Sequence, residues 1–185
     1  MSDSVLMLTK ALDFAARRHA HQRRKGATAE PYVNHVIAVA HLLAEVTEGR
    51  DAELVAAGLL HDTVEDTDTT LDELSQAFGA DIADLVAQVT DDKSLPKAER
   101  KRLQIEKAPG KSERAKMLKL ADKVCNLKSL RESPPEDWDD ARRRDYFDWA
   151  KRVADGCRGV NGFLEQAFDR AWQAGTERYA EPTEP

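Results

Sequence analysis

The sequence predicts a single all-α domain, and three observations support that prediction. Apolar residues recur at steps of three and four along most of the chain, which is the period of amphipathic helices. No stretch shows a convincing alternation of apolar and polar residues, as a strand would. Nine glycines and seven prolines in 185 residues suit helices with short connections, and the length fits one domain.

The first helix is indicated by a stripe of residues near the N-terminus: Val5, Leu8, Leu12, Ala15 and His19. The second is "PYVNHVIAVAHLLAEV", with Asn34 as the expected N-cap. Its expected buried residues are Val36, Val39, Leu43 and Val46. The third, "DAELVAAGLLHD", is apolar on most sides and should lie at the centre of the fold.

The remaining elements follow from capping signals and chain breaks. "TTLDEL" has the spacing of a capping box from Thr70 to Glu73 before a fourth helix. Five further helices are expected at 80–90, 97–107, 112–131, 136–155 and 159–174. The breaks fall near Gly26 and at "DDKSLP", "APGKS" and "ESPPED". The tail "YAEPTEP" has the composition of a frayed, disordered end.

Composition limits the classes of function. A net charge of −6 argues against a general binder of nucleic acid or membrane surfaces. Two basic segments, 17–25 and 93–119, indicate either an anionic ligand or solvated helix faces. Two cysteines without a C-x-x-C motif fit neither a disulfide framework nor a zinc finger and suggest a reducing, cytoplasmic setting. No apolar run nears the roughly eighteen residues of a spanning helix.

The stretch "GLLHDTVEDTDTT" is the first sign of chemistry. His61 and Asp62 end a hydrophobic run, and Glu65 and Asp66 follow within a turn. Like charges one turn apart repel, so a bound cation is one explanation and a solvated acidic helix end is the other. Imidazole together with carboxylate is a common ligand set for divalent metals. Two ligands hold a metal poorly, so further ligands are expected from other helices.

Two more residues qualify as ligands. His35 stands at the start of the second helix. Asp122, in "MLKLADKVCNLKSL", lies at the border of a mostly apolar face, where an unpartnered carboxylate would be costly. Asn126 follows one turn later on the same side. These positions make a metal site shared by three helices a specific expectation.

The pattern of His35, His61-Asp62 and Asp122 resembles that of the HD-domain metal-dependent phosphohydrolases. The chain is still more similar to the hydrolase domain of RelA/SpoT proteins and to stand-alone small alarmone hydrolases, including metazoan ones. The shared stretches are "HAHQRRKG", "PYVNHVIAVA", "GLLHDTVEDT", "KLADKVCNL" and "RDYFDWAKRVADGCRGVN". One departure is Val36, where family members usually have proline, and it alters little beyond the helix start.

The resemblance implies an HD-type helical bundle over residues 1–178, followed by the tail 179–185. It implies that one Mn²⁺ is held by His35, His61, Asp62 and Asp122, and that Glu65 and Asp66 orient or deprotonate the attacking water. It also implies substrate contacts from Arg24, which stacks on guanine, from Lys25, which meets phosphate, and from Asn126 and Tyr146, which line the pocket. The implied reaction converts ppGpp or pppGpp to GDP or GTP plus pyrophosphate.

Alternatives remain open at this point. Another phosphorylated nucleotide, such as NADPH with its 2′-phosphate, would also fit the basic segments. A catalytically inactive HD module that binds nucleotide or a protein partner is a different class, which the filled ligand and Glu-Asp positions disfavour. The expected partner is a small guanine nucleotide, with no nucleic acid and no membrane. His19, His21 and His41 are expected to be structural or exposed, and Lys97 and Arg142 to be solvated more than phosphate-bound.

Overall fold

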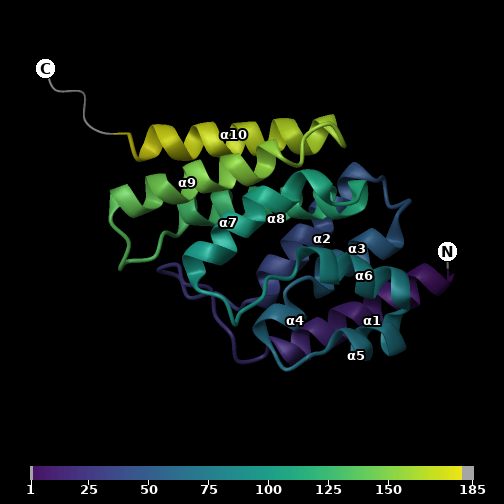
Figure 1. Ribbon diagram of the computed structural model, residues 1–185. Coiled ribbons are helices and arrows are strands. Elements are labelled where there is room, and N and C mark those ends of the chain that lie inside the picture. Colours follow the sequence, from purple (N-terminus) through teal and green to yellow (C-terminus); the bar gives the residue numbers. More distant parts are fainter. Residues whose placement is uncertain (1, 181–185) are drawn as a thin grey trace, which may run out of the picture.

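The computed structural model describes residues 2–180, and helices make up most of that range (Figure 1). The helices are α1 (Ser2–Arg18), α2 (Val33–Val46), α3 (Ala52–Leu60), α4 (Thr63–Asp66), α5 (Leu71–Phe78), α6 (Ala80–Val89), α7 (Lys97–Lys107), the 3₁₀ turn η1 (Ala108–Gly110), α8 (Glu113–Glu132), α9 (Asp140–Asp155) and α10 (Gly162–Arg178). Between residues 2 and 180 there is no strand, only an isolated bridge between Arg23 and Pro31. The all-α prediction is confirmed.

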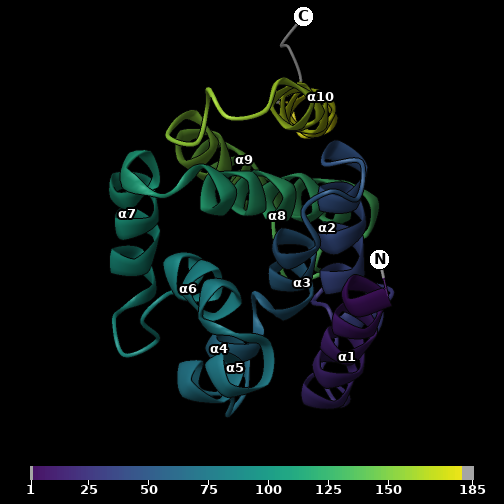
Figure 2. The ribbon, with the colours of Figure 1, turned by 90° about the vertical axis from the view of Figure 1, so that its right-hand side faces the viewer.

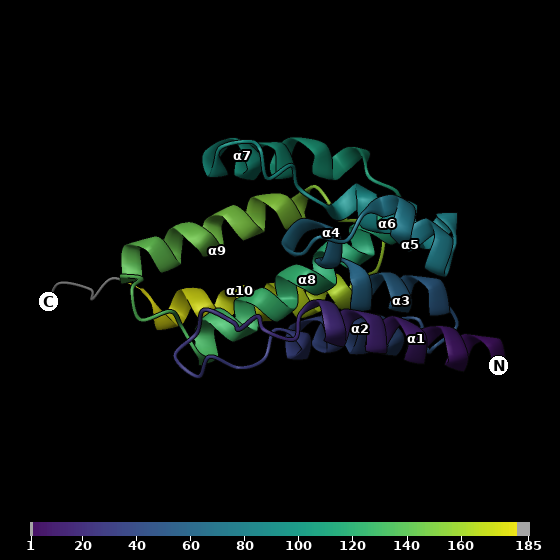
Figure 3. The same ribbon diagram turned by 90° about the horizontal axis from the view of Figure 1, so that it is seen from below.

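Helix α3 lies at the centre, as its composition predicts. It packs against α1, α2, α6 and α8, and every residue from Leu54 to Leu60 is buried. Figure 2 shows α1 and α2 on one side of it and α7 on the other, with α8 and α10 above. From below, α7 runs beside α9 on the side opposite α1 and α2 (Figure 3). No helix among the described residues is both long and apolar enough to cross a bilayer.

One aspartate fixes where α3 begins. The Asp51 side chain accepts a hydrogen bond from the Leu54 N–H at 3.0 Å and so caps the helix. The same carboxylate pairs with the guanidinium of Arg114, which lies in the first turn of α8. The cap therefore ties the start of the central helix to the start of the longest one.

Gly58 allows α2 and α3 to approach closely. A Cβ at this position would lie 2.9 Å from Leu43 Cδ1 and 3.1 Å from the Ala40 Cα, which is closer than packed atoms normally stand. A glycine at the crossing therefore lets the two backbones meet one turn before His61. The close approach places the end of α3 beside the start of α2.

Some local predictions were wrong or incomplete. Asn34 does not cap α2, because the helix already starts at Val33; its N-cap residue, Tyr32, provides no side-chain cap. Val46 is only partly buried. Thr70 does cap α5 through the Glu73 N–H, but the Glu73 side chain pairs with Arg18 in place of a return bond.

The last two helices also differ from their predicted ranges. Helix α9 starts at Asp140, later than expected, because the Asp139 side chain accepts the Arg142 N–H at 2.7 Å and caps the helix there. Helix α10 continues to Arg178, and Tyr179 after it is buried, with its hydroxyl donating to the Leu130 carbonyl at 3.0 Å. The predicted tail thus begins with a packed residue, and its residues 181–185 lie outside the described range.

Candidate functional site

Three helices bring the predicted metal-ligand residues together. His35 lies in the first turn of α2, His61 and Asp62 follow the end of α3, and Asp122 lies near the middle of α8. All three of His35, His61 and Asp122 are buried, at 5%, 4% and 7% exposure. Burying so many ionisable groups at one point is costly unless they compensate one another or hold an ion.

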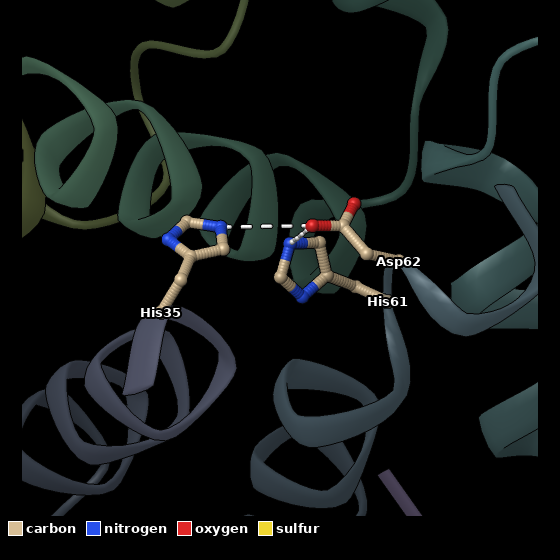
Figure 4. A group of neighbouring side chains, drawn as sticks. All are labelled: His35, His61 and Asp62. Atoms are coloured by element: carbon tan, nitrogen blue, oxygen red, sulfur yellow. Dashed lines mark ion pairs between the residues drawn. The ribbon is translucent and has the colours of Figure 1, made fainter. Parts of the chain in front are cut away.

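Both imidazoles face the Asp62 carboxylate (Figure 4). The Asp62 Oδ2 atom is 3.1 Å from His61 Nε2 and 3.6 Å from His35 Nε2. One ligand atom from each of these three residues falls within 4.8 Å of the other two, close enough for all three to bind one ion. Asp122 approaches from α8, with Oδ1 at 3.3 Å from His35 Nε2 and 3.8 Å from His61 Nε2.

The nitrogen atoms at the centre of this cluster fit a cation. Among the described residues, neither His35 Nε2 nor His61 Nε2 has a well-formed hydrogen bond, although both are buried. The His61 Nδ1 atom is 2.8 Å from the Gly58 carbonyl oxygen, which can only accept, so Nδ1 carries the proton. In the neutral ring this leaves the Nε2 lone pair directed at Asp62, as a metal ligand requires.

The electrostatics of the cluster also suit a positive ion. Burial alone would lower the pKa of His61, but the nearby carboxylates of Asp62 and Asp122 outweigh it and raise the pKa to about 10. Burial dominates at His35 and lowers its pKa. Despite burial, the Asp122 carboxyl has a pKa well below its usual range, because Lys123 and the imidazoles favour its charged form. The carboxylates thus remain ionised and draw a cation or a proton.

Glu65 and Asp66 lie on the short helix α4, next to the cluster. Glu65 Oε2 accepts the Asp91 N–H at 3.1 Å, and its Oε1 is 3.7 Å from Arg100. Asp66 forms an ion pair with Lys93, which also lies near Glu65. Burial is the main reason that the pKa of Glu65 is raised, so the carboxylate is better able to accept a proton near neutral pH.

A cleft of about 610 Å³ opens beside the cluster and contacts both acids of α4. Its lining carries more positive than negative side chains. The cations are Arg23, Arg24, Lys25, Lys93, Lys97, Arg100, Lys101 and Arg142, and the acids are Glu65, Asp66, Asp91 and Asp145. Such a surface suits an anion with several charges.

Three aromatic rings form one wall of this cleft. Trp138 and Tyr146 have centroids 5.7 Å apart, and Tyr146 and Trp149 are 5.2 Å apart. Lys101 lies over the Trp149 ring at 4.8 Å, and Arg142 over that of Trp138 at 4.5 Å. Flat apolar faces next to cations are typical of a pocket for a base attached to phosphates.

The structure places all four predicted substrate residues, Arg24, Lys25, Asn126 and Tyr146, in the lining of this cleft. Arg24 donates to Asn126 Oδ1 at 2.8 Å, although the two residues come from distant parts of the sequence. Lys97 and Arg142, expected to be solvated, line the cleft as well. The cleft therefore holds more cations than the sequence prediction assigned to it.

Sequence reasoning missed several residues of the site. Tyr32 donates its hydroxyl to Asp62 Oδ2 at 2.6 Å, and burial beside Asp62 raises its pKa. Its signal was its place three residues before His35, one helical turn away. Lys93 and Arg100 were noted only as part of a basic segment. Lys123 was not singled out, yet it is buried against Asp122, 3.1 Å from Oδ2, and its Nζ lies 4.6 Å from the centre of the Trp149 ring.

The other three histidines lie outside the cluster. His21 and His41 are exposed. His19 is buried, and its Nδ1 is 2.7 Å from Gln22 Oε1. Gln22 in turn donates to the Asp66 carbonyl at 2.6 Å, so His19 helps to hold Gln22 against α4 and has a structural role. The expectation that these histidines are structural or exposed is confirmed.

Comparisons with known proteins agree with this geometry. Residues 11–147 match the family described as "HD domain". The chain is 52% identical over 168 residues to guanosine-3′,5′-bis(diphosphate) 3′-pyrophosphohydrolase MESH1 of Homo sapiens, covering 91% of this chain and 94% of that protein. It is 41% identical over 129 residues to guanosine-3′,5′-bis(diphosphate) 3′-pyrophosphohydrolase of Aquifex aeolicus (strain VF5), covering 66% of this chain and 18% of that one.

A solved structure is similar over nearly the whole chain. It is described as "A metazoan ortholog of SpoT hydrolyzes ppGpp and plays a role in starvation responses". The two chains are 47% identical, with a TM-score of 0.87, and the match covers 90% of this chain and 94% of the other. At that identity the likeness extends beyond the fold to the sequence.

Proposed function

The chain belongs to the HD domain family, and we propose that within it the protein is a metal-dependent guanosine-3′,5′-bis(diphosphate) 3′-pyrophosphohydrolase. The observation that carries the proposal is the meeting of His35, His61, Asp62 and Asp122 beside a basic, aromatic-walled cleft. Relatives of nearly the same length carry that activity in their names. The filled site disfavours the inactive binding module.

We propose that the cation is a single Mn²⁺ ion bound by these four residues. Carboxylate ligands suit Mn²⁺, and imidazole broadens the choice to Fe²⁺ and Zn²⁺. A bound divalent cation of this kind lowers the pKa of a coordinated water and polarises phosphoryl oxygens. Cys125 and Cys157 are both free, which is compatible with the reducing cytosolic setting that we propose for the enzyme.

The residues of the chain supply the remaining steps. Glu65, with its raised pKa, accepts a proton from the attacking water, and Asp66 helps to orient that water. The water oxygen bonds to the phosphorus attached to the ribose 3′-oxygen. The bond between that phosphorus and the 3′-oxygen breaks, the oxygen takes up a proton from solvent, and Glu65 returns its proton to solvent. The products from ppGpp are GDP and intact pyrophosphate.

The cleft residues hold the nucleotide in place for this attack. Arg24 offers a planar guanidinium on which guanine can stack, and Lys25 offers a point charge to a phosphate. The cations of α7 and α9, among them Lys97 and Arg142, can neutralise the remaining phosphate charge. Tyr146 and the two tryptophans around it close the pocket on the apolar side.

The direct test is to incubate the purified protein with ppGpp and Mn²⁺ and to measure GDP and pyrophosphate. Stoichiometric release of both supports the proposal. Release of single phosphates would identify an ordinary phosphatase, and faster turnover of NADPH than of ppGpp under matched conditions would favour the nucleotide 2′-phosphate as substrate. Removal of metal with EDTA should abolish the activity, and added Mn²⁺ should restore it.

A further inference from the structure

Arg24 contacts two residues that each reach the metal-ligand cluster. Its Nη2 donates to Asn126 Oδ1 at 2.8 Å, and its guanidinium carbon lies 5.5 Å from the centre of the Tyr32 ring. Arg24 also lines the cleft, so another side of it is open to a ligand. One side chain of the cleft thus contacts two further lining residues, Tyr32 and Asn126, that reach the cluster.

Each of these two residues donates a hydrogen bond to a different carboxylate of the cluster. The Tyr32 hydroxyl donates to Asp62 Oδ2, and Asn126 Nδ2 donates to Asp122 Oδ1, both at 2.6 Å. These are the same two oxygens that face the imidazoles of His35 and His61. Tyr32 and Asn126 therefore orient the carboxylate atoms that would meet the cation.

The orientation of the Asn126 amide is fixed by its two neighbours. A guanidinium has only donors and an ionised carboxylate only acceptors. The amide oxygen must therefore face Arg24 and the amide nitrogen must face Asp122. Turning the amide around would break both bonds, so Arg24 holds the donor toward Asp122.

Tyr32 is equally restricted. Its ring lies 5.0 Å from that of His19 and 5.7 Å from that of His35, centroid to centroid, with the Arg24 guanidinium near it as well. Groups that orient metal ligands typically change metal affinity by about 10–100-fold when removed. A ligand contact that fixes Arg24 should thus change the affinity of the site for the cation. By reciprocity, the bound cation should change the affinity of Arg24 for that ligand.

We propose that Tyr32 and Asn126 are positioning residues that couple the nucleotide-binding Arg24 energetically to the metal-ligand carboxylates Asp62 and Asp122. The coupling rests on the proposed function for its ligands. Cation binding and base binding would each strengthen the other through these two residues, without any direct contact between the ligands.

The sign of one mutation separates this coupling from simple electrostatics. Removing the positive Arg24 near a cation should by itself tighten Mn²⁺ binding or leave it unchanged. The coupling instead predicts that Arg24→Ala weakens Mn²⁺ binding by about tenfold. Arg23→Ala is the matched control, because it removes the same charge from a neighbouring cleft position and should not weaken binding.

The experiment is Mn²⁺ calorimetry on metal-free protein, with Arg24→Ala made in the wild type and in the Tyr32→Phe/Asn126→Leu double variant. We expect the loss caused by Arg24→Ala to vanish in the double variant. Tyr32→Phe alone is the milder variant and should reduce that loss. Tyr179→Phe, which also removes one buried tyrosine hydroxyl, should leave it intact. A loss of equal size in all backgrounds, or no loss in the wild type, overturns the proposal.

Guanosine tests the nucleotide half, because it carries no phosphate to chelate the metal. Its affinity for the wild type should rise when Mn²⁺ is present, and the rise should disappear in the double variant. Equal affinity with and without Mn²⁺ overturns the coupling, and no guanosine binding overturns the stacking role of Arg24. Failure of the proposed reaction would appear separately, as absence of pyrophosphate release from ppGpp by the wild type.

Discussion

The Nδ1–H of His61 donates to the carbonyl oxygen of Gly58, one turn earlier in the same segment, at 2.8 Å. This bond leaves Nε2 as the atom that exchanges a proton for a cation. The pKa of His61 is raised to about 10, so without metal the ring is protonated throughout the neutral range. Metal binding below that pH must therefore release a proton, and metal affinity must rise with pH.

We expect Mn²⁺ binding at pH 7.5 to release about one proton per site. Calorimetry in buffers of different ionisation enthalpy measures this number directly. An observed enthalpy that is independent of the buffer would show that His61 is already neutral. It would also contradict the assignment of Nε2 as a ligand atom that is protonated in the metal-free protein.

Asp122→Asn should weaken Mn²⁺ binding more than the loss of an orienting group does, hence by more than about 100-fold. The amide keeps the shape but lacks the charge that balances the cation. It also leaves the buried Lys123 without its ion-pair partner. Asp155→Asn, a more exposed change of the same kind, is the control for folding and charge. Full activity of Asp122→Asn at low Mn²⁺ would remove Asp122 from the ligand set.

Glu65→Gln should lower kcat by about 10²–10⁴-fold while the protein still binds Mn²⁺ and ppGpp. The raised pKa of Glu65 has a further consequence for the wild type. Its kcat should fall as the pH drops through that pKa, because the protonated acid cannot accept a proton. Steady-state kinetics and ppGpp calorimetry test both points. Asp68→Asn, an exposed change nearby, should keep wild-type kcat.

Arg24→Ala should act mainly on KM when Mn²⁺ is saturating. A lost stacking contact with a cation costs about 1–2 kcal/mol, which corresponds to a factor of about 5–30 in KM. Because the contact is made equally in ground and transition states, kcat should change little. A variant whose kcat falls while its KM stays constant would place Arg24 in the chemical step.

Gly175→Ala should lower the free energy of unfolding by about 1–3 kcal/mol. A Cβ there would overlap the ring of Phe147, which is fully buried between α9 and α10. The helix-forming advantage of alanine, up to about 1 kcal/mol, opposes this only in part. Gly162→Ala on the same helix meets open space and should be neutral or stabilising. Thermal and urea unfolding of the two variants gives the comparison.

Much of this fold could be predicted because its signals are local. The apolar stretch before His61 predicts a buried central helix, and the breaks at "DDKSLP", "APGKS" and "ESPPED" mark the ends of α6, α7 and α8. The errors lie where a neighbour in space decides. Asn34 is a residue type that often caps helices, but α2 begins before it, after Tyr32. Tyr179 looked like the start of a tail, yet it packs against Phe147.

The candidate site divides in the same way. His35, His61, Asp62 and Asp122 could be chosen because buried ionisable residues stand out against apolar surroundings. Lys93 and Arg100 could not, since a cation in a basic segment looks solvated until its partner is known. Both of their partners, Glu65 and Asp66, come from a different helix. Ion pairs between distant parts of the chain leave no periodic pattern in the sequence from which they could be predicted.

The assembly of the cluster from α2, α3 and α8 has a mechanical consequence. An ion held there would act as a crosslink between segments far apart in the chain, as a disulfide does in a secreted protein. At a concentration 100 times its dissociation constant, such a ligand stabilises the native state by about 2.7 kcal/mol. Because α3 is buried against α1, α2, α6 and α8, both its amide hydrogen exchange and proteolysis of the chain would slow when the ion is bound. Metal starvation would then shorten the lifetime of the protein as well as stop its turnover of substrate.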